Sequence, residues 1–265
     1  MNYIGVDIGT SNIKIIEVDK KLGVKNRNIL KKMTPEKALE KFINENNINL
    51  SNIEKIFATG VGANDLGEYF LNKQIVKVPE FTATGSIGDD EKFLVASIGT
   101  GTAFIKNEKG EITHLGGTGI GGGTLINLCK KINPNINFED LKNIELTASL
   151  KNVDLTIQDV TTEEIKTLPK DTTAVNFGKL NNKATNEDII LGIMNMVFET
   201  IGVMAALAAK GANTTNIIAI GQIVKIPYAR KVFDKIEKLH NVKITIPPDA
   251  EYGTAIGEIK AIIYK

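Results

Sequence analysis

Cysteine is nearly absent from this 265-residue sequence, which contains Cys129 alone. A lone cysteine cannot form an internal disulfide, and one chain with a single thiol cannot build an all-cysteine zinc or iron–sulfur site. Cys129 stands among apolar residues with helical spacing, so we expect a buried thiol that packs as a small hydrophobic side chain.

An excess of charge of either sign is also missing. The chain has 32 basic and 31 acidic side chains, which gives a formal net charge of +1. Such a chain carries no general electrostatic field that would attract nucleic acid or an anionic membrane. We therefore expect neither a nucleic-acid partner nor a membrane partner.

The sequence has no uninterrupted apolar run of membrane-spanning length. The longest candidate, residues 189–209, contains Asn195 and Glu199 and is better interpreted as a buried helix. The first residues lack the basic and apolar regions of a secretory signal, so the cytoplasm is the expected location. A length of 265 residues and a hydrophobic fraction of 42% suit a globular protein of two lobes.

Residues 93–106 are the most informative stretch that is present. An apolar run enters the turn Gly99-Thr100-Gly101-Thr102, and a second apolar run leaves it, which predicts a β-hairpin. Glycines allow backbone N–H groups to converge on an anion, and threonines add hydroxyl donors. A plain tight hairpin explains the same residues equally well.

The N-terminus repeats this plan. Residues 5–16 and residues 95–106 align with Ile-Gly-Thr in register. Two copies of one phosphate-type hairpin predict a duplicated fold that closes on a single polyphosphate. Asp7 ends the first strand, where a carboxylate can hold Mg²⁺ beside a triphosphate; a turn-capping role is the alternative. Lys14 points either to phosphate or to solvent.

The segment 116–123 is the richest in glycine and holds six of them. It leads directly into an apolar helix, whose first N–H groups lack internal partners and attract an anion. A flexible linker is the alternative, but linkers rarely continue into an amphipathic helix.

Glu80 is the most suggestive carboxylate. It follows a Val-Pro exit from a strand and precedes an apolar phenylalanine, which favours a position in a cleft. A single placed carboxylate can act as general base toward a hydroxyl group. The alternative is an acid that stabilises the N-terminus of a helix.

Farther along, the spacing predicts a short helix over 138–150, an irregular insertion over 161–182 and a long helix over 186–211. A buried strand ends at Gln222, which should face the crevice as the ends of parallel strands do. In the terminal helix, over 252–263, Gly253 and Gly257 would let a purine approach the backbone. We expect two lobes, residues 1–91 and 92–265.

Taken together, these segments resemble the type II pantothenate kinases, within the actin, hexokinase and heat-shock ATPase superfamily. The resemblance spans residues 3–264 and includes Pro79-Glu80-Phe81, the two hairpins, the glycine-rich segment, Thr172–Gly178 and Gly253–Gly257. It implies an α/β, duplicated actin-like (ribonuclease H-like) two-lobe fold with ATP in the interlobe cleft. The implied reaction is ATP-dependent phosphorylation of pantothenate, the first step of coenzyme A biosynthesis, by a Mg²⁺-dependent homodimer.

The resemblance also implies residue roles. Glu80 is the catalytic base, and Asp7 is the metal-linked residue. ATP is expected at Asp7, Ile8, Gly9, Thr10, Ser11, Asn12, Ile13 and Lys14, at Gly121, Gly122, Gly123, Thr124, Leu125 and Ile126, and at Gln222. The acceptor is expected at Thr100, Gly101, Thr102, His114 and Phe138.

One residue departs from the family pattern. The family has an arginine near the substrate where this chain has His114, and a histidine cannot give the same fixed, permanently charged contact. We expect a raised Michaelis constant for pantothenate, with partial recovery in His114→Arg. The alternatives are a kinase of a related alcohol such as pantetheine and a catalytically weak nucleotide-binding regulator. An activator of a radical dehydratase, which needs cluster-binding cysteines, is disfavoured by the lone Cys129.

Overall fold

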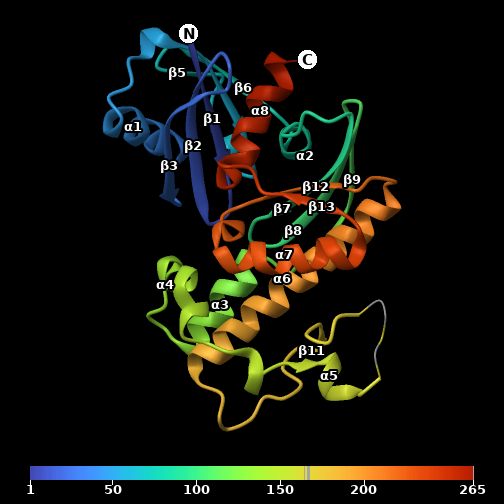
Figure 1. The fold of residues 1–265 in the computed structure, drawn as a ribbon. Helices are drawn as coiled ribbons and strands as arrows, with labels where there is room; N and C mark the ends of the chain where they lie inside the picture. The colour runs from blue at the N-terminus through green and yellow to red at the C-terminus, as the bar shows by residue number, and fades with distance from the viewer. Residues whose placement is uncertain (164, 166–167, 265) are drawn as a thin grey trace.

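The computed structural model describes residues 1–163, 165 and 168–264, and two β-sheets dominate it (Figure 1). The first sheet has the strand order β3-β2-β1-β4-β6-β5. β1 pairs antiparallel with β2 and parallel with β4. The strands are β1 (Asn2–Ile8), β2 (Asn12–Asp19), β3 (Val24–Lys31), β4 (Ile53–Thr59), β5 (Tyr69–Phe70) and β6 (Lys73–Lys77).

The second sheet repeats this plan. Its order is β13-β12-β7-β8-β9, in which β7 pairs antiparallel with β8 and parallel with β12. Its strands are β7 (Lys92–Ile98), β8 (Thr102–Glu108), β9 (Glu111–Thr118), β12 (Asn216–Ile220) and β13 (Lys243–Thr245). In both sheets a three-stranded meander continues into parallel strands, which confirms the predicted duplication.

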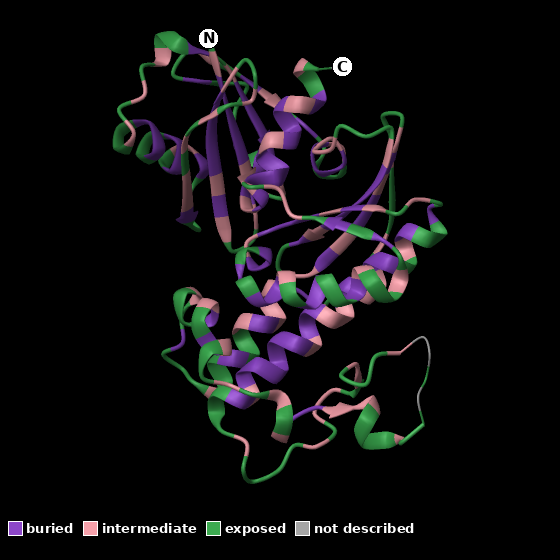
Figure 2. Ribbon diagram, in the orientation of Figure 1, coloured by how far each residue is buried: buried purple, intermediate pink, exposed green. Residues whose placement is uncertain are grey.

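Helices cover both faces of the first sheet because its central strands are apolar on both sides. Ile4, Val6 and Ile8 pack toward α1 (Pro35–Glu45), whereas Tyr3 on the opposite face packs toward α8 (Gly253–Ile263). This period-2 alternation follows from the pleat of a strand. It also places Asp7 on the same face as Tyr3, at the end of β1 that borders the cleft described below. Figure 2 shows β1 buried along most of its length.

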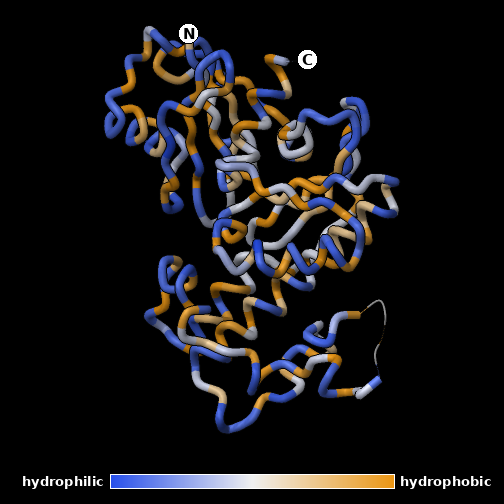
Figure 3. The backbone as a smooth tube through the Cα atoms, viewed as in Figure 1, coloured by the Kyte–Doolittle hydropathy of each residue, from blue (hydrophilic) through white to orange (hydrophobic). Residues whose placement is uncertain are grey.

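The outer face of the second sheet packs on helices. Leu94, Ala96 and Ile98 of β7 share a core with α3 (Gly122–Ile132), α6 (Asn186–Gly211) and α7 (Pro227–His240). Figure 3 shows hydrophobic residues running through the strands of both sheets and through α6. Helix α6 is apolar and long enough to cross a membrane, but 67% of its most apolar window is buried within the protein, which identifies it as a core helix.

Helix α8 belongs with the first sheet although it is the last element of the chain. It shares a core with Tyr3, Phe57 and Ala83, a contact that crosses the expected lobe boundary between residues 91 and 92. Its glycines explain how closely it packs: a Cβ on Gly257 would lie 2.0 Å from the carbonyl oxygen of Ala83 in α2 (Glu80–Gly85). Gly253 likewise faces the side chain of Ile220. The expected role in purine approach is therefore wrong for both glycines, which pack against protein.

The expected helix over 138–150 is interrupted. α4 (Phe138–Asn143) ends early, and two short 3₁₀ turns follow, Ile144–Leu146 and Leu150–Asn152. The extended backbone of Ser149 breaks the segment, and the Ser149 N–H donates to Asp188 of α6 over 2.7 Å. The contact with α6 therefore explains why the helix does not continue through Ser149.

The insertion after residue 153 contains β10 (Leu155–Thr156), α5 (Ile157–Val160) and β11 (Thr173–Val175); part of the expected irregular segment 161–182 lies outside the described residues. It is tied to α6 through Asp154, which accepts hydrogen bonds from the N–H of Phe177 at 2.8 Å and from Asn195 at 2.9 Å. The Asn-Phe-Gly segment of the family resemblance thus has a structural role within this chain.

Candidate active site

A cleft of about 940 Å³ lies between the two sheets and is lined by both hairpins. It brings together most of the predicted site residues: Asp7, Gly9, Thr10, Ser11, Asn12, Lys14, Glu80, Thr100, Gly101, Thr102, Gly122, Gly123, Ile126, Phe138 and Gln222. Residues more than 200 positions apart in the sequence meet here, because the two copies of the fold face one another.

The two hairpins have loops of equal length, and their tips meet. Three residues separate β1 from β2, and three separate β7 from β8. The hydroxyl oxygens of Thr10 and Thr100 lie 3.2 Å apart, within hydrogen-bonding distance of each other. Both side chains are exposed to the cleft, so each is able to donate to a phosphate oxygen placed between the loops.

Asp7 and Lys14 form an ion pair on the first hairpin. They stand directly opposite each other in the β1–β2 register, and Lys14 Nζ lies 3.4 Å from Asp7 Oδ2. Opposite charges placed across two antiparallel strands stabilise the pair. The hairpin thereby presents one carboxylate and one ammonium group to the cleft.

Glu80 is the first residue of α2 and lines the cleft. The sequence left two locations open for Glu80, in a cleft or at the N-terminus of a helix, and the structure shows both. Desolvation among the surrounding protein atoms raises the pKa of the Glu80 carboxyl, the negative charge of Asp7 raises it further, and Lys14 opposes the change. A carboxyl group with a raised pKa in a cleft is suited to accept a proton.

The glycines before α3 have a packing role that the sequence did not predict. The N–H groups of Gly122 and Gly123 donate to the carbonyl oxygens of Gly99 and Thr100 at 2.8 and 3.0 Å, so they are not free for an anion. A Cβ on Gly121 would lie 2.7 Å from the backbone of Gly101. These glycines therefore allow the start of α3 to pack directly against the second hairpin.

Several predicted site residues lie outside the lining of the cleft. The side chains of Ile8, Ile13 and Leu125 are buried in the two hydrophobic cores, because alternation along each strand and helix turns them inward. Gly121 is buried behind the hairpin, and the Thr124 hydroxyl donates to Gly119 O at 3.0 Å. None of these five residues lines the cleft.

His114 is exposed on β9, and its ring stacks on that of Phe81 with centroids 4.3 Å apart. It does not appear among the residues that line the cleft. Phe138 does line it, where the Lys142 ammonium group lies 5.2 Å from the Phe138 ring centroid.

The cleft also contains residues that the sequence did not single out: Lys31, Asn127, Lys130, Glu251 and Thr254. Lys130 follows Ile126 by one helical turn, a spacing that could have indicated it. Lys31 stands opposite Asn12 in the β2–β3 pairing, which the sequence does not reveal.

Mg²⁺ fits the donor set at Asp7. Among the described residues there is no group of three or more side chains with metal-ligand chemistry. Mg²⁺ is commonly held by one or two carboxylates together with substrate phosphates and water, so a preformed protein cage is not required. Asp7, beside the two hairpins, offers such a carboxylate.

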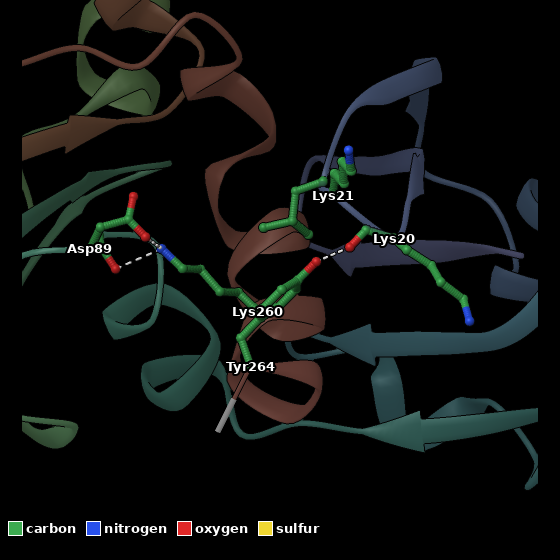
Figure 4. A pocket seen from close by; sticks show the side chains of 7 residues that line it. Lys20, Lys21, Asp89, Lys260 and Tyr264 are labelled. Atoms are coloured by element: carbon green, nitrogen blue, oxygen red, sulfur yellow. Dashed lines mark hydrogen bonds and ion pairs between the residues drawn. The ribbon is translucent and has the colours of Figure 1, made fainter.

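A second hollow, of about 600 Å³, lies where the β2–β3 turn, residues 88–89 and the end of α8 meet. Lys260 occupies it and donates to the carbonyl oxygens of Ile87 and Gly88 and to the carboxylate of Asp89 (Figure 4). Tyr264 donates to the carbonyl oxygen of Lys20. The polar groups of Lys260 and Tyr264 are therefore already paired within the protein. Their hydrogen bonds attach the end of α8 to residues 87–89 and to the β2–β3 turn.

Comparison with protein families gives a match to the Fumble family over residues 88–232. A type II pantothenate kinase of Bacillus thuringiensis subsp. konkukian is 30% identical over 238 residues, which cover 82% of each chain. A type II pantothenate kinase of Bacillus cereus is 27% identical over 283 residues, covering 98% of this chain and 96% of the relative.

Solved structures share the fold at low sequence identity. An activator of 2-hydroxyisocaproyl-CoA dehydratase from Clostridium difficile, with bound ADPNP, has a TM-score of 0.70 at 17% identity and covers 100% of this chain and 95% of its own. A ROK family glucokinase from Streptomyces griseus, in complex with glucose and AMPPNP, has a TM-score of 0.63 at 9% identity, with coverage of 97% and 98%. In the present chain, burial raises the pKa of Cys129 to about 12, so its thiol is no ready metal ligand.

Proposed function

This chain belongs to the Fumble family of type II pantothenate kinases, and on that premise we propose that it transfers the γ-phosphoryl group of ATP to the primary hydroxyl of pantothenate. The observation that carries the proposal is the meeting of Glu80, Asp7 and the two hairpin tips in one cleft. Phosphoryl transfer depends mostly on positioning and on neutralising charge, and this cleft provides residues for both.

In the proposed reaction Glu80 accepts the proton of the acceptor hydroxyl. The hydroxyl oxygen forms a bond to the γ-phosphorus, and the bond from that phosphorus to the bridging oxygen breaks. The bonding electron pair leaves with ADP. Thr10, Ser11 and Thr100 donate hydrogen bonds to phosphate oxygens, and Lys14 balances the negative charge that gathers near Asp7.

Asp7 would hold Mg²⁺, which when bound supplies positive charge to the phosphates. The ion pair with Lys14 keeps the Asp7 carboxylate oriented along the hairpin. Asp7, in turn, helps to raise the pKa of Glu80. The metal-linked residue and the base are therefore electrostatically coupled.

The proposal is tested by measuring ADP release from Mg-ATP with pantothenate, pantetheine, related alcohols and sugars as acceptors. We expect the highest kcat/KM with pantothenate and a phosphorylated product at its primary hydroxyl. Turnover with pantetheine but not pantothenate would reassign the acceptor. ATP binding without turnover on any acceptor would identify a nucleotide-binding regulator and refute the kinase.

We further propose that the kinase acts as a homodimer in the cytoplasm. Large apolar side chains are exposed in the C-terminal half, namely Leu146, Val160, Val175, Leu180 and Leu207, and burial against a second copy would remove them from water. Sedimentation velocity should give twice the chain mass of 28.8 kDa, and a monomer at micromolar concentration would contradict the homodimer.

A further inference from the structure

Phe81 directly follows the proposed base Glu80, and its ring is in contact with a ring from another element. Although 44% exposed, the ring stacks on the His114 imidazole with centroids 4.3 Å apart and planes only 8° from parallel. Phe81 lies on α2, whereas His114 lies on β9 of the second sheet. The stack therefore connects the helix of Glu80 with the sheet that carries the second hairpin.

A second contact lies one helical turn farther along the same face of α2. Gly85 follows Phe81 by four residues, so the two share one side of the helix. A Cβ on Gly85 would lie 2.8 Å from Ile112 Cγ2. Ile112 precedes His114 by two residues on β9 and shares its strand face. Helix α2 thus rests on β9 at both of its ends, which fixes its direction.

A β-bulge in β9 selects the residue that meets Phe81. Phe104 of β8 stands opposite Gly116, but the next residue, Ile105, stands opposite His114. Without the shift, Leu115 would oppose Ile105. Gly116 has a φ of +138° with open space around it, a conformation that other residues rarely adopt. Bulges beside active sites commonly redirect a side chain in this way.

Glu80 depends on this support because its carboxylate has no hydrogen-bond donor among the described residues; only burial and the charges of Asp7 and Lys14 act on it. Its location follows from the backbone of α2. We propose that Phe81 and His114 are positioning residues, whose stack fixes Glu80 relative to the Gly99–Gly101 loop. This rests on the proposed function of Glu80 as the base.

Removal of either ring tests the proposal. Phe81→Ala and His114→Ala should each lower kcat with pantothenate by about 10- to 100-fold, the range for a misplaced reacting group, with little change in the KM of ATP or pantothenate. The double variant should be no slower than the single variants, because one contact is lost in all three. His114→Phe keeps a ring on β9 and should restore most of kcat.

The same series distinguishes positioning from substrate contact. If His114 binds the acceptor, His114→Phe raises the KM of pantothenate and His114→Arg lowers it, and the positioning role is refuted. Thr113→Ala is the matched control, since Thr113 is exposed on the same strand and, by strand alternation from His114, faces away from α2. We expect wild-type kinetics for it.

Hydrogen exchange gives a readout that needs no acceptor. The Ala83 N–H, which donates to Pro79 O at 2.9 Å, should exchange faster in both alanine variants and return toward wild type in His114→Phe. If the wild-type protein shows no turnover, the proposed kinase activity is refuted. Hydrogen exchange still tests whether the Phe81–His114 stack holds α2 in place. Unchanged exchange, or faster exchange with unchanged kcat in an active enzyme, would overturn the positioning role.

Discussion

Single carboxylates in this protein differ because of what lies beside them. Glu80 opens onto the cleft, whereas Glu258 of α8 is fully buried. One oxygen of Glu258 accepts a hydrogen bond from the Val6 N–H, and the other has no partner among the described residues. The negative charge of Asp7, at the end of β1, helps to raise the pKa of both carboxyl groups.

Replacement of Glu80 by glutamine should lower kcat by about two to four decades, the usual contribution of a general base. The kcat/KM of the wild type should fall as pH decreases through the pKa of Glu80, which lies above the ordinary value of 4.5. Initial rates measured between about pH 5 and pH 9 give both the loss of kcat in Glu80→Gln and the fall of wild-type kcat/KM at low pH. The melting temperature of Glu80→Gln should not fall, since the variant removes a partly desolvated charge.

Glu68→Gln, at an exposed position outside the cleft, is the matched control and should retain wild-type rates. Full activity of Glu80→Gln in folded protein would rule out Glu80 as the base.

Glu258 should make stability fall as pH rises. Burial first, and then the charge of Asp7, raise its pKa well above 4.5, while the Val6 N–H opposes this. The folded state therefore holds a proton that the unfolded chain releases near pH 4.5, and unfolding becomes easier from that pH up to the raised pKa. Glu258→Gln, which cannot titrate, should flatten this slope in urea titrations between pH 5 and 9. Equal slopes in both proteins would contradict the prediction.

At the scale of elements, α8 packs very closely against both α2 and β1. Gly257 lies against the Ala83 carbonyl oxygen, and a Cβ on Gly5 of β1 would lie 2.3 Å from the carbonyl oxygen of Ala255. Backbone atoms cannot yield as a flexible side chain can. These glycines are therefore explained by how closely helix and strand approach.

Gly257→Ala should destabilise the fold by about 1–3 kcal/mol, as overpacking commonly does, and lower the melting temperature by about 2–10 °C. Gly211→Ala, at the end of α6 with nothing within 4 Å of the added Cβ, should be neutral or slightly stabilising. Calorimetry of the two variants measures the difference, and equal melting temperatures would show that the α2–α8 contact relaxes without cost.

At the scale of the whole molecule, the cleft lies between the two sheets and is lined by residues of both hairpins. A ligand held by both hairpins should therefore stabilise the entire fold. At 100 times its Kd, a non-hydrolysable ATP analogue with Mg²⁺ should add about 2.7 kcal/mol, seen as a higher melting temperature.

Asp7→Asn should remove most of the Mg²⁺-dependent part of this increase, while keeping the part that the nucleotide gives without metal. Thr113→Ala should behave as wild type. If the melting temperature of the wild type rises equally with and without Mg²⁺, Asp7 does not hold a metal ion beside the nucleotide.

Most of the architecture and of the cleft followed from local sequence. Alternating apolar residues specify each strand, and the repeated Ile-Gly-Thr turn specifies the two hairpins, because the pleat and the turn depend on near neighbours in the chain. The sequence therefore predicted the duplicated fold, the long helix over 186–211 and cleft residues such as Asp7, Glu80 and Thr100.

Only the tertiary structure decided what depends on distant partners. Gly257 resembles a nucleotide-contacting glycine until the Ala83 carbonyl oxygen is seen against it. From the sequence, the N–H groups of Gly122 and Gly123 have no evident partner, but in the structure they donate to carbonyl oxygens of the second hairpin. His114 meets Phe81 only because a bulge changes the register of β9. Each of these contacts joins residues far apart in the chain, and their energy depends on distances that local composition does not contain.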